Sequence, residues 1–371
     1  MKAIGIILAG GHANSLGPLT DERASSAMPV GSCYRCLDFP LSNMTNSGIG
    51  KVAVITQYLS RSLWDHLSSS KWWDFGRKQG GLFIFSPFLS TDNTAWFRGT
   101  ADSIYQNLTY LKRSNEPYVV IANGNAVYKM DYNLILDYHA RKEADVTIVY
   151  QRAREGDNLK QYGVLEMDAF NRITDIDEKP LEPQSDLISL GIYVVSRTLL
   201  IKLLESTNAE EGRYDLVKDV FTRYRKKLRI FGYKFEGYWR AVNSVQAYFQ
   251  CNMDFLGRDL RRLLTIDEPF IETKPKDEPP AKYNSNARVR DSLVGSGSIL
   301  NGDLRHSVVF RRVFTGDNSQ ITNAVIMEGS YIGNNCVVEN AIVDKEVVLS
   351  DGRRLIGTPE NPAIVAKGAV I

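Results

Sequence analysis

The stretch AIGIILAGG (residues 3–11) joins a short, continuous apolar run to a glycine-rich loop. A run of this length, rich in Ile and Leu, is typical of a strand that is covered on both faces of a sheet. The run leads directly into glycines rather than into a cleavage site, so residues 3–9 are interpreted as a first buried strand and not as a secretion signal. Glycines after such a strand expose backbone N–H groups that can bind phosphate oxygens.

Strand-like runs of the same character recur through the first two thirds of the chain, with helical stretches between them. The runs are KVAVIT (51–56), YVVIAN (118–123), DVTIVYQ (145–151), ISLGIYVV (188–195) and LRIFGYKF (228–235). This alternation predicts the α/β class, with a doubly wound, mostly parallel sheet of the Rossmann-like kind. Ligands of such a sheet bind at the carboxyl ends of its strands.

Two of the helical stretches show which face should be buried. In residues 101–113 the apolar side chains share one face of the helix, and the same holds for residues 131–143. The predicted core residues of the second helix are Leu134, Ile135 and Tyr138.

A six-residue period replaces this pattern after about residue 290. Its positions are Val313, Ser319, Val325, Tyr331, Val337, Val343 and Leu349. Such a period is typical of a β-helix, whose three-sided coils stack apolar positions into one core. An antiparallel sandwich with accidental spacing is the alternative, but seven positions in one frame favour a left-handed parallel β-helix.

The sequence therefore predicts three parts. Residues 1–245 form the α/β domain, residues 246–290 a helix and a proline-rich linker, and residues 291–371 the β-helix.

The composition is that of an ordinary globular protein. The 371 residues carry a formal net charge of +2, which gives no electrostatic reason to expect nucleic acid or a membrane surface as a partner. No apolar run approaches the length that spans a bilayer, and four cysteines are too few for a disulfide framework. Cys33 and Cys36 form a C-x-x-C without a second ligand pair, so reduced thiols in a cytoplasmic protein are expected.

Five motifs together point to a family. They are LAGGHANSLGPLT (8–20), RASSAMPVGSCYRCLDFPLSN (23–43), GTADSIYQN (99–107), IDEKP (176–180) and YKFEGYWR (233–240). Over nearly its whole length the chain resembles ADP-glucose pyrophosphorylase (glucose-1-phosphate adenylyltransferase), which joins ATP and glucose-1-phosphate to make ADP-glucose for glycogen or starch.

The resemblance implies two sets of binding residues. The nucleotide loop would include Leu8, Ala9, Gly10, Gly11, Gly99 and Thr100. The sugar-phosphate pocket would include Glu178, Lys179, Ser189, Tyr193, Asp215 and Trp239. Lys suits the phosphate and Glu suits sugar hydroxyls, although Tyr193 and Trp239 are equally well explained as packing residues.

The chain departs from the family at positions where the family's residues bind phosphate groups and the catalytic metal ion. Ala13 replaces a glycine of the loop and Ser15 an arginine, while Ser25 and Cys33 replace two lysines. Asn125 and Ala241 stand where the family has aspartates that hold the catalytic Mg²⁺. An amide is a neutral ligand and a methyl group is no ligand at all, so the resemblance implies a degenerate metal site. The alternative is that neighbouring acids, Asp131 and Asp177, have taken over.

These departures lead to a functional expectation. The chain is expected to be a regulatory, non-catalytic subunit, inactive or very weak alone, that pairs with a catalytic ADP-glucose pyrophosphorylase subunit in a heterotetramer. Mg²⁺ would be used by that partner, with no cofactor held by this chain, and the ligands would be sugar phosphate together with ATP or phosphorylated effectors. Arg23 and Arg35 match effector-binding basic residues, although a solvated surface role suits them as well. The alternatives are a self-sufficient altered nucleotidyltransferase and a sugar-phosphate-sensing scaffold.

Overall fold

The chain forms two compact units that are interleaved along the sequence. The computed structural model describes residues 1–11, 14–76, 80–88, 96–208 and 212–371. The first unit comprises Met1–Gly11, Pro40–Gly124 and Tyr128–Trp239, and the second comprises His12–Phe39, Asn125–Val127 and Arg240–Ile371. The chain thus leaves the first unit and returns to it twice before it enters the second for the last time.

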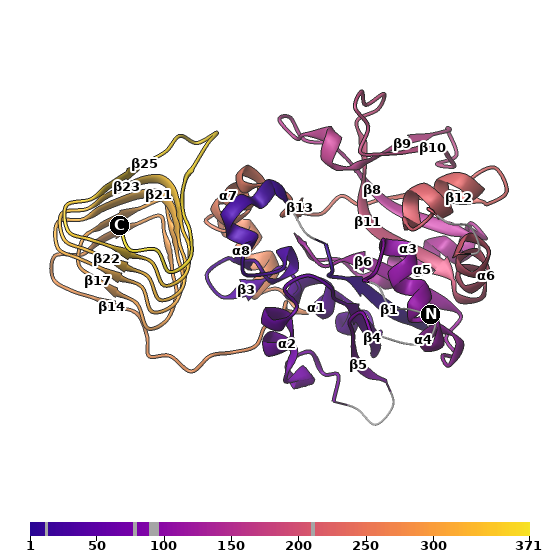
Figure 1. Cartoon of the computed structure of the whole chain (residues 1–371), viewed down its shortest axis with the longest axis horizontal. Helices are drawn as coiled ribbons and strands as arrows, with labels where there is room; N and C mark the ends of the chain where they lie inside the picture. Colours follow the sequence, from indigo (N-terminus) through magenta and orange to yellow (C-terminus); the bar gives the residue numbers. More distant parts are fainter. Residues whose placement is uncertain (12–13, 77–79, 89–95, 209–211) are drawn as a thin grey trace. The chain divides into compact units, whose positions relative to one another are not determined.

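A nine-stranded sheet is the centre of the first unit (Figure 1). Its strands are β1 (Ala3–Leu8), β4 (Lys51–Ile55), β5 (Gly81–Phe85), β6 (Tyr118–Asn123), β8 (Val146–Arg152), β9 (Gly163–Met167), β10 (Ile173–Glu178), β11 (Leu187–Ser196) and β12 (Ile230–Lys234). The main path runs β10-β9-β11-β6-β1-β4-β5, and β8 lies between β11 and β12. The predicted α/β class is confirmed, and each of the six predicted strands is present within two residues of its expected ends.

The strands on both sides of β1 run parallel to it, as their apolar character predicts. Ala3–Leu8 pairs with β6 on one side and with β4 on the other, and its residues Ile4 to Ile7 are buried. β11 instead runs antiparallel to β6 and β8. Its pairing with β8 is interrupted between Ser189 and Tyr193, where Gly191 has a φ of 69°. A β-carbon at Gly191 would lie 2.1 Å from the Asn123 side chain, so the irregularity requires glycine.

Helices of the first unit lie between the strands in sequence. They are α2 (Arg61–Leu67), α3 (Thr100–Gln106), α4 (Leu108–Lys112), α5 (Tyr132–Arg141), α6 (Arg197–Asn208) and a π-helix at Leu216–Thr222, while α1 (Asp38–Asn46) crosses the boundary between the units. The prediction for the face of α5 is wrong at Leu134, which is 56% exposed. Ile135 is buried as predicted, and Leu136 and His139 are buried with it, since the i, i+1, i+4 spacing of these residues defines the covered stripe.

Buried His139 gives the first unit a predictable acid sensitivity. Its Nδ1 lies 2.8 Å from Thr147 Oγ1, its ring packs edge-on against Tyr118, and burial lowers the pKa of His139 to about 4. The unfolded chain therefore binds this proton first as the pH falls below the ordinary value of 6.5. Stability from this group is fully present above that value and is lost as the pH falls to about 4, a loss of about 3 kcal/mol.

We expect His139→Gln, which stays neutral, to remove this part of the pH dependence. Urea unfolding at pH 7 and at pH 4 should show a fall in the free energy of unfolding that is about 3 kcal/mol smaller in the variant than in the unmodified chain. Equal falls in the two proteins would contradict the assignment.

The second unit combines three separate stretches of chain, of which the last, Arg240–Ile371, carries the β-helix. Its N-terminal stretch carries short strands β2 (Pro29–Val30) and β3 (Tyr34–Arg35), which pair with each other. The helix predicted to begin the 246–290 segment is present as α7 (Val245–Asp254) and α8 (Arg258–Thr265), with a break at Gly257. Tyr248 of α7 donates a hydrogen bond to the Pro29 carbonyl (2.8 Å), so α7 is attached to the N-terminal stretch.

The C-terminal part is the predicted parallel β-helix, whose stacked coils Figure 1 shows. One face is formed by β14 (Lys282–Tyr283), β17 (Ile299–Leu300), β20 (Phe314–Thr315), β22 (Tyr331–Ile332) and β24 (Val348–Leu349). The other strands are β15 (Arg288–Arg290), β16 (Leu293–Val294), β18 (Asp303–Arg305), β19 (Val308–Val309), β21 (Gln320–Ile326), β23 (Val337–Val343), β25 (Arg354–Ile356) and β26 (Ala363–Val365). Neighbouring strands of successive coils are parallel, which is consistent with the predicted left-handed coil.

The strict six-residue frame is wrong at two positions. Tyr331 is 41% exposed and Val337 is half-buried, whereas the next residues, Ile332 and Val338, are fully buried. The reason is that the later coils repeat every 17 residues, as the hydrogen bond from Asn323 to Asn340 illustrates, and not every 18. The frame therefore slips by one residue within a coil, although the stacked core is the one expected.

Among the residues that the structure describes, no helix is long and apolar enough to cross a membrane.

Candidate functional site

The glycine-rich loop follows β1 at the carboxyl edge of the parallel strands. Ala9 N donates to the Ile55 carbonyl (2.8 Å), and Gly124 N donates to the Leu8 carbonyl (2.9 Å), so the ends of β1, β4 and β6 are tied together. Apart from its chain neighbours, no atom of the described residues lies within 4 Å of the place where a β-carbon of Gly11 would be, whereas one at Gly10 would meet Gln57 at 3.1 Å. Ala13 lies outside the described residues.

Gly99 and Thr100, assigned to the nucleotide loop by resemblance, lie against the segment that begins the π-helix. A β-carbon at Gly99 would be 2.4 Å from the Tyr214 carbonyl oxygen, so only glycine permits this approach. Thr100 Oγ1 donates to Asp215 Oδ2 (3.2 Å) and accepts from Leu216 N (2.8 Å). Asp215 Oδ1 accepts from Val217 N and Lys218 N, so this carboxylate caps the π-helix.

Three residues of the predicted sugar-phosphate pocket are close neighbours. The carboxylate of Glu178, at the end of β10, and Ser189 of β11 both flank Gly163: a β-carbon there would lie 2.8 Å from Glu178 Oε2 and 3.5 Å from Ser189 Cβ. Burial raises the pKa of Glu178, and the negative charge of Asp215 raises it further. Burial likewise raises the pKa of Tyr193, with the charge of Glu178 adding to the effect. Three of the predicted pocket residues, Glu178, Tyr193 and Asp215, therefore influence one another electrostatically.

Lys179 and Trp239 extend this group through Tyr162. Lys179 N donates to the Tyr162 carbonyl (3.0 Å). The backbone of Lys179 has a φ of 55°, and its side chain is exposed. The Tyr162 ring lies 5.9 Å from the Trp239 ring, and Arg154 donates to the Trp239 carbonyl (3.1 Å). Trp239 is buried, and its indole nitrogen has no hydrogen-bond partner among the described residues. An N–H donor in that state is suited to a ligand oxygen.

Three of the replaced positions, 15, 125 and 241, lie within or directly beside one short segment of the second unit. Ser15 Oγ donates a hydrogen bond to the Asn243 carbonyl, and Val242 N donates to the Asn125 carbonyl (2.7 Å). Ala241, the residue before Val242, is buried. Positions that lie more than 100 residues apart in sequence are thus adjacent in the fold.

None of these three side chains carries a charge. An arginine at 15 and aspartates at 125 and 241 would place a cation and two cation ligands around this segment, whereas Ser, Asn and Ala supply a hydroxyl, an amide and a methyl group. Across the described part of the chain, no group of three or more His, Cys, Asp or Glu side chains is arranged to hold a metal ion.

The two arginines that resemble effector-binding residues both belong to the second unit. Arg23 is buried and pairs with Asp344 of the β-helix at 2.7 Å. Arg35 is half-buried, its backbone N–H donates to Asp38 Oδ2 (2.8 Å), and burial lowers the pKa of its guanidinium.

Sequence reasoning missed Tyr162, Arg154 and Tyr214. Tyr162 and Arg154 support Trp239, and the Tyr214 ring lies 4.0 Å from the Arg98 guanidinium. Only the sequence position of Tyr162, directly before Gly163 and the start of β9, could have indicated it.

Comparisons with known proteins agree with the fold and with the motifs. The family model for nucleotidyl transferases matches residues 4–258, and a model described as GlmU-like, C-terminal hexapeptide matches residues 279–362. The chain is 38% identical to the glucose-1-phosphate adenylyltransferases of Bacillus cereus (strain Q1) and Bacillus thuringiensis (strain Al Hakam), over 95% of this chain and 94% of each relative. It is 37% identical to that of Bacillus mycoides (strain KBAB4) over the same shares. The chain therefore belongs to the glucose-1-phosphate adenylyltransferase family of nucleotidyl transferases.

Proposed function

We propose that this chain is a non-catalytic, regulatory subunit of a glucose-1-phosphate adenylyltransferase. It would assemble with a catalytic homologue in a heterotetramer, within the cytoplasm, and change the turnover or effector response of that homologue during glycogen synthesis. Such an effect is a coupling free energy between sites in different subunits.

The observation that supports the proposal is that three residues with neutral side chains, Ser15, Asn125 and Ala241, lie within or directly beside the segment Ala241–Asn243. Transfer of a nucleotidyl group requires that charge on the attacked phosphate and on the leaving pyrophosphate be stabilised, which in these reactions is the task of Mg²⁺ and basic side chains. Asn125 and Ala241 cannot replace two carboxylates, and Ser15 cannot replace a guanidinium. Because each missing group of this kind often lowers the rate roughly 10²-fold, the combined loss is expected to leave little activity.

The sugar-phosphate side is proposed to be retained. Glu178, Ser189 and the unpaired indole nitrogen of Trp239 offer an acceptor and donors for sugar hydroxyls, and Lys179 offers a charge for the phosphate. Mg²⁺ is assigned to the catalytic partner, and ATP or a phosphorylated effector remains a further proposed ligand.

The experiment that tests this function measures ADP-glucose synthesis by the purified chain with Mg²⁺, ATP and glucose-1-phosphate, alone and mixed with the catalytic homologue from the same source. The proposal is supported if the chain alone makes no ADP-glucose and if its presence changes the kinetics of the catalytic homologue in the mixture. Robust turnover by the chain alone would instead establish an altered but self-sufficient nucleotidyltransferase. Sugar-phosphate binding by a chain that leaves the homologue unaffected would establish a sensing scaffold.

Binding of glucose-1-phosphate is predicted to depend on Lys179. We expect Lys179→Ala to weaken binding at least about tenfold in isothermal titration calorimetry, because a charge-assisted hydrogen bond to phosphate is lost. Lys160→Ala removes an exposed lysine of the same unit and should bind as the unmodified chain does. Equal affinities of the two variants would show that Lys179 is a solvated surface charge.

A further inference from the structure

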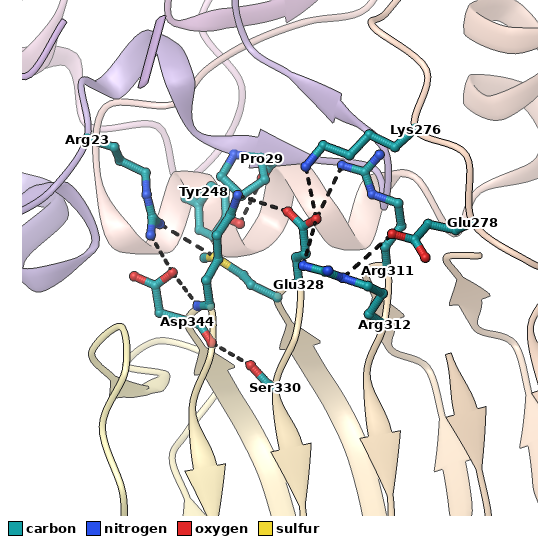
Figure 2. Close-up of polar contacts among 12 residues, drawn as sticks. Arg23, Pro29, Tyr248, Lys276, Glu278, Arg311, Arg312, Glu328, Ser330 and Asp344 are labelled. Atoms are coloured by element: carbon teal, nitrogen blue, oxygen red, sulfur yellow. Dashed lines mark hydrogen bonds and ion pairs between the residues drawn. The ribbon is translucent and has the colours of Figure 1, made fainter. Parts of the chain in front are cut away.

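One corner of the β-helix holds four basic side chains around a single carboxylate (Figure 2). Glu328 Oε1 lies 3.0 Å from Lys276 Nζ, and its Oε2 lies 3.2 Å from Lys345 Nζ. Two guanidinium groups, those of Arg311 (3.8 Å) and Arg312 (3.7 Å), complete the set. The side chain of Glu328 is only 9% exposed, so this is a partly desolvated cluster rather than a surface ion pair.

The members come from different parts of the chain. Arg311, Glu328 and Lys345 occupy the same corner of three successive coils, and Lys276 is supplied by the linker that follows α8. Arg312 also contacts Glu278 of that linker, at 3.7 Å. The Glu328 carboxylate therefore joins three coils of the β-helix to the linker.

The electrostatics show that the cations dominate this corner. Burial alone would raise the pKa of Glu328, but the charges of Lys345, Lys276 and Arg311 lower it to about 2. Burial, followed by the charge of Arg35, lowers the pKa of Lys345 to about 8. Among the described residues that form ion pairs at this corner, two carboxylates, Glu328 and Glu278, face four basic side chains, and the nearby charge of Arg35 adds to the positive set. Arg311 Nε has no hydrogen-bond partner among the described residues.

Four cationic groups converging on one point is the arrangement that proteins use to bind a phosphate group, since ammonium and guanidinium groups provide charge-assisted donors. Here that point is filled by the chain itself. We propose that Glu328 is an internal anion that occupies a phosphate-type cation site on the β-helix, and that it fastens the linker to this corner without any bound ligand. The inference concerns the second unit alone and does not depend on the proposed function.

The test removes the negative charge of Glu328 while keeping the size and shape of its side chain. Glu328→Gln removes the charge, and Glu339→Gln makes the same change at an exposed position of the same β-helix. Melting temperatures are measured with increasing inorganic phosphate and, separately, with NaCl at equal ionic strength. In NaCl we expect Glu328→Gln to melt roughly 5 °C or more below Glu339→Gln, because four cations lose their counter-ion.

Phosphate should then raise the melting temperature of Glu328→Gln in a saturable way. In the unmodified chain and in Glu339→Gln, phosphate should raise the melting temperature no more through this site than NaCl does. Adding Arg312→Gln to Glu328→Gln should abolish most of that gain, which separates this corner from phosphate bound elsewhere. If Glu328→Gln does not fold, Glu328→Asp, which keeps the charge but shortens the side chain, should show a smaller phosphate response of the same kind. Equal phosphate responses in the unmodified chain and the Glu328 variants would overturn the proposal.

Discussion

A chain that carries Asn125→Asp together with Ala241→Asp should acquire Mg²⁺-dependent synthesis of ADP-glucose at least about a hundredfold faster than the unmodified chain. The two positions flank the hydrogen bond from Val242 N to the Asn125 carbonyl, so both new carboxylates would lie beside one short segment. Turnover should stay below that of an active relative, because Ser15 still stands where the family has an arginine. Release of pyrophosphate, followed in a coupled assay, measures the gain.

The same variant should also respond to Mg²⁺ in its stability. Ala241 is buried, and an uncompensated carboxylate there is costly, so the melting temperature of the double variant should rise with MgCl₂. Asn361→Asp makes the same amide-to-acid change at an exposed site and should show neither effect. A double variant no more active than Asn361→Asp would indicate that other acids already serve the metal, as the altered-enzyme alternative requires.

Loss of Arg23 should be among the most destabilising single changes in the second unit. Its guanidinium pairs with Asp344 at 2.7 Å, both side chains are almost completely buried, and Asp344 Oδ2 has no hydrogen-bond partner among the described residues. Arg23→Ala leaves that carboxylate buried without its counter-charge, so we expect the free energy of unfolding to fall by about 3–5 kcal/mol. Urea unfolding at pH 7 measures the difference.

Arg290 offers the matched control, because it is an exposed arginine of the same unit and Arg290→Ala should cost under about 0.5 kcal/mol. Replacing both partners, Arg23→Met with Asp344→Leu, should recover most of the stability, since no charge is then left buried. An Arg23→Ala variant as stable as Arg290→Ala would show that the pair contributes nothing and would return Arg23 to a solvated role.

The sequence was most informative where burial on both faces left a continuous apolar run. The strands at Ala3–Leu8 and Tyr118–Asn123 were predictable for that reason. The hairpin β9–β10 was missed, because its exposed residues interrupt the apolar signal. Leu134 was assigned to the wrong face of α5, since an apolar residue in a helix does not show by itself which neighbours cover it.

The site was only partly predictable, for a topological reason. The types of residue at 15, 125 and 241 could be compared with the family, but their convergence on Ala241–Asn243 depends on long-range pairing that no local pattern records. The corner at Glu328 was missed because charged residues in turns usually remain solvated. The 17-residue spacing of Arg311, Glu328 and Lys345 was the signal that could have indicated it.

The interleaving of the two units affects how the protein can fold during synthesis and where it can be truncated. Residues 12–39 belong with the β-helix, yet they emerge from the ribosome more than 200 residues before it does. The buried guanidinium of Arg23 therefore has no counter-charge until Asp344 has been synthesised, and the second unit cannot complete its folding before that point. For the same reason the β-helix is not a transferable module: a cut near residue 245 would separate it from the N-terminal stretch against which it packs.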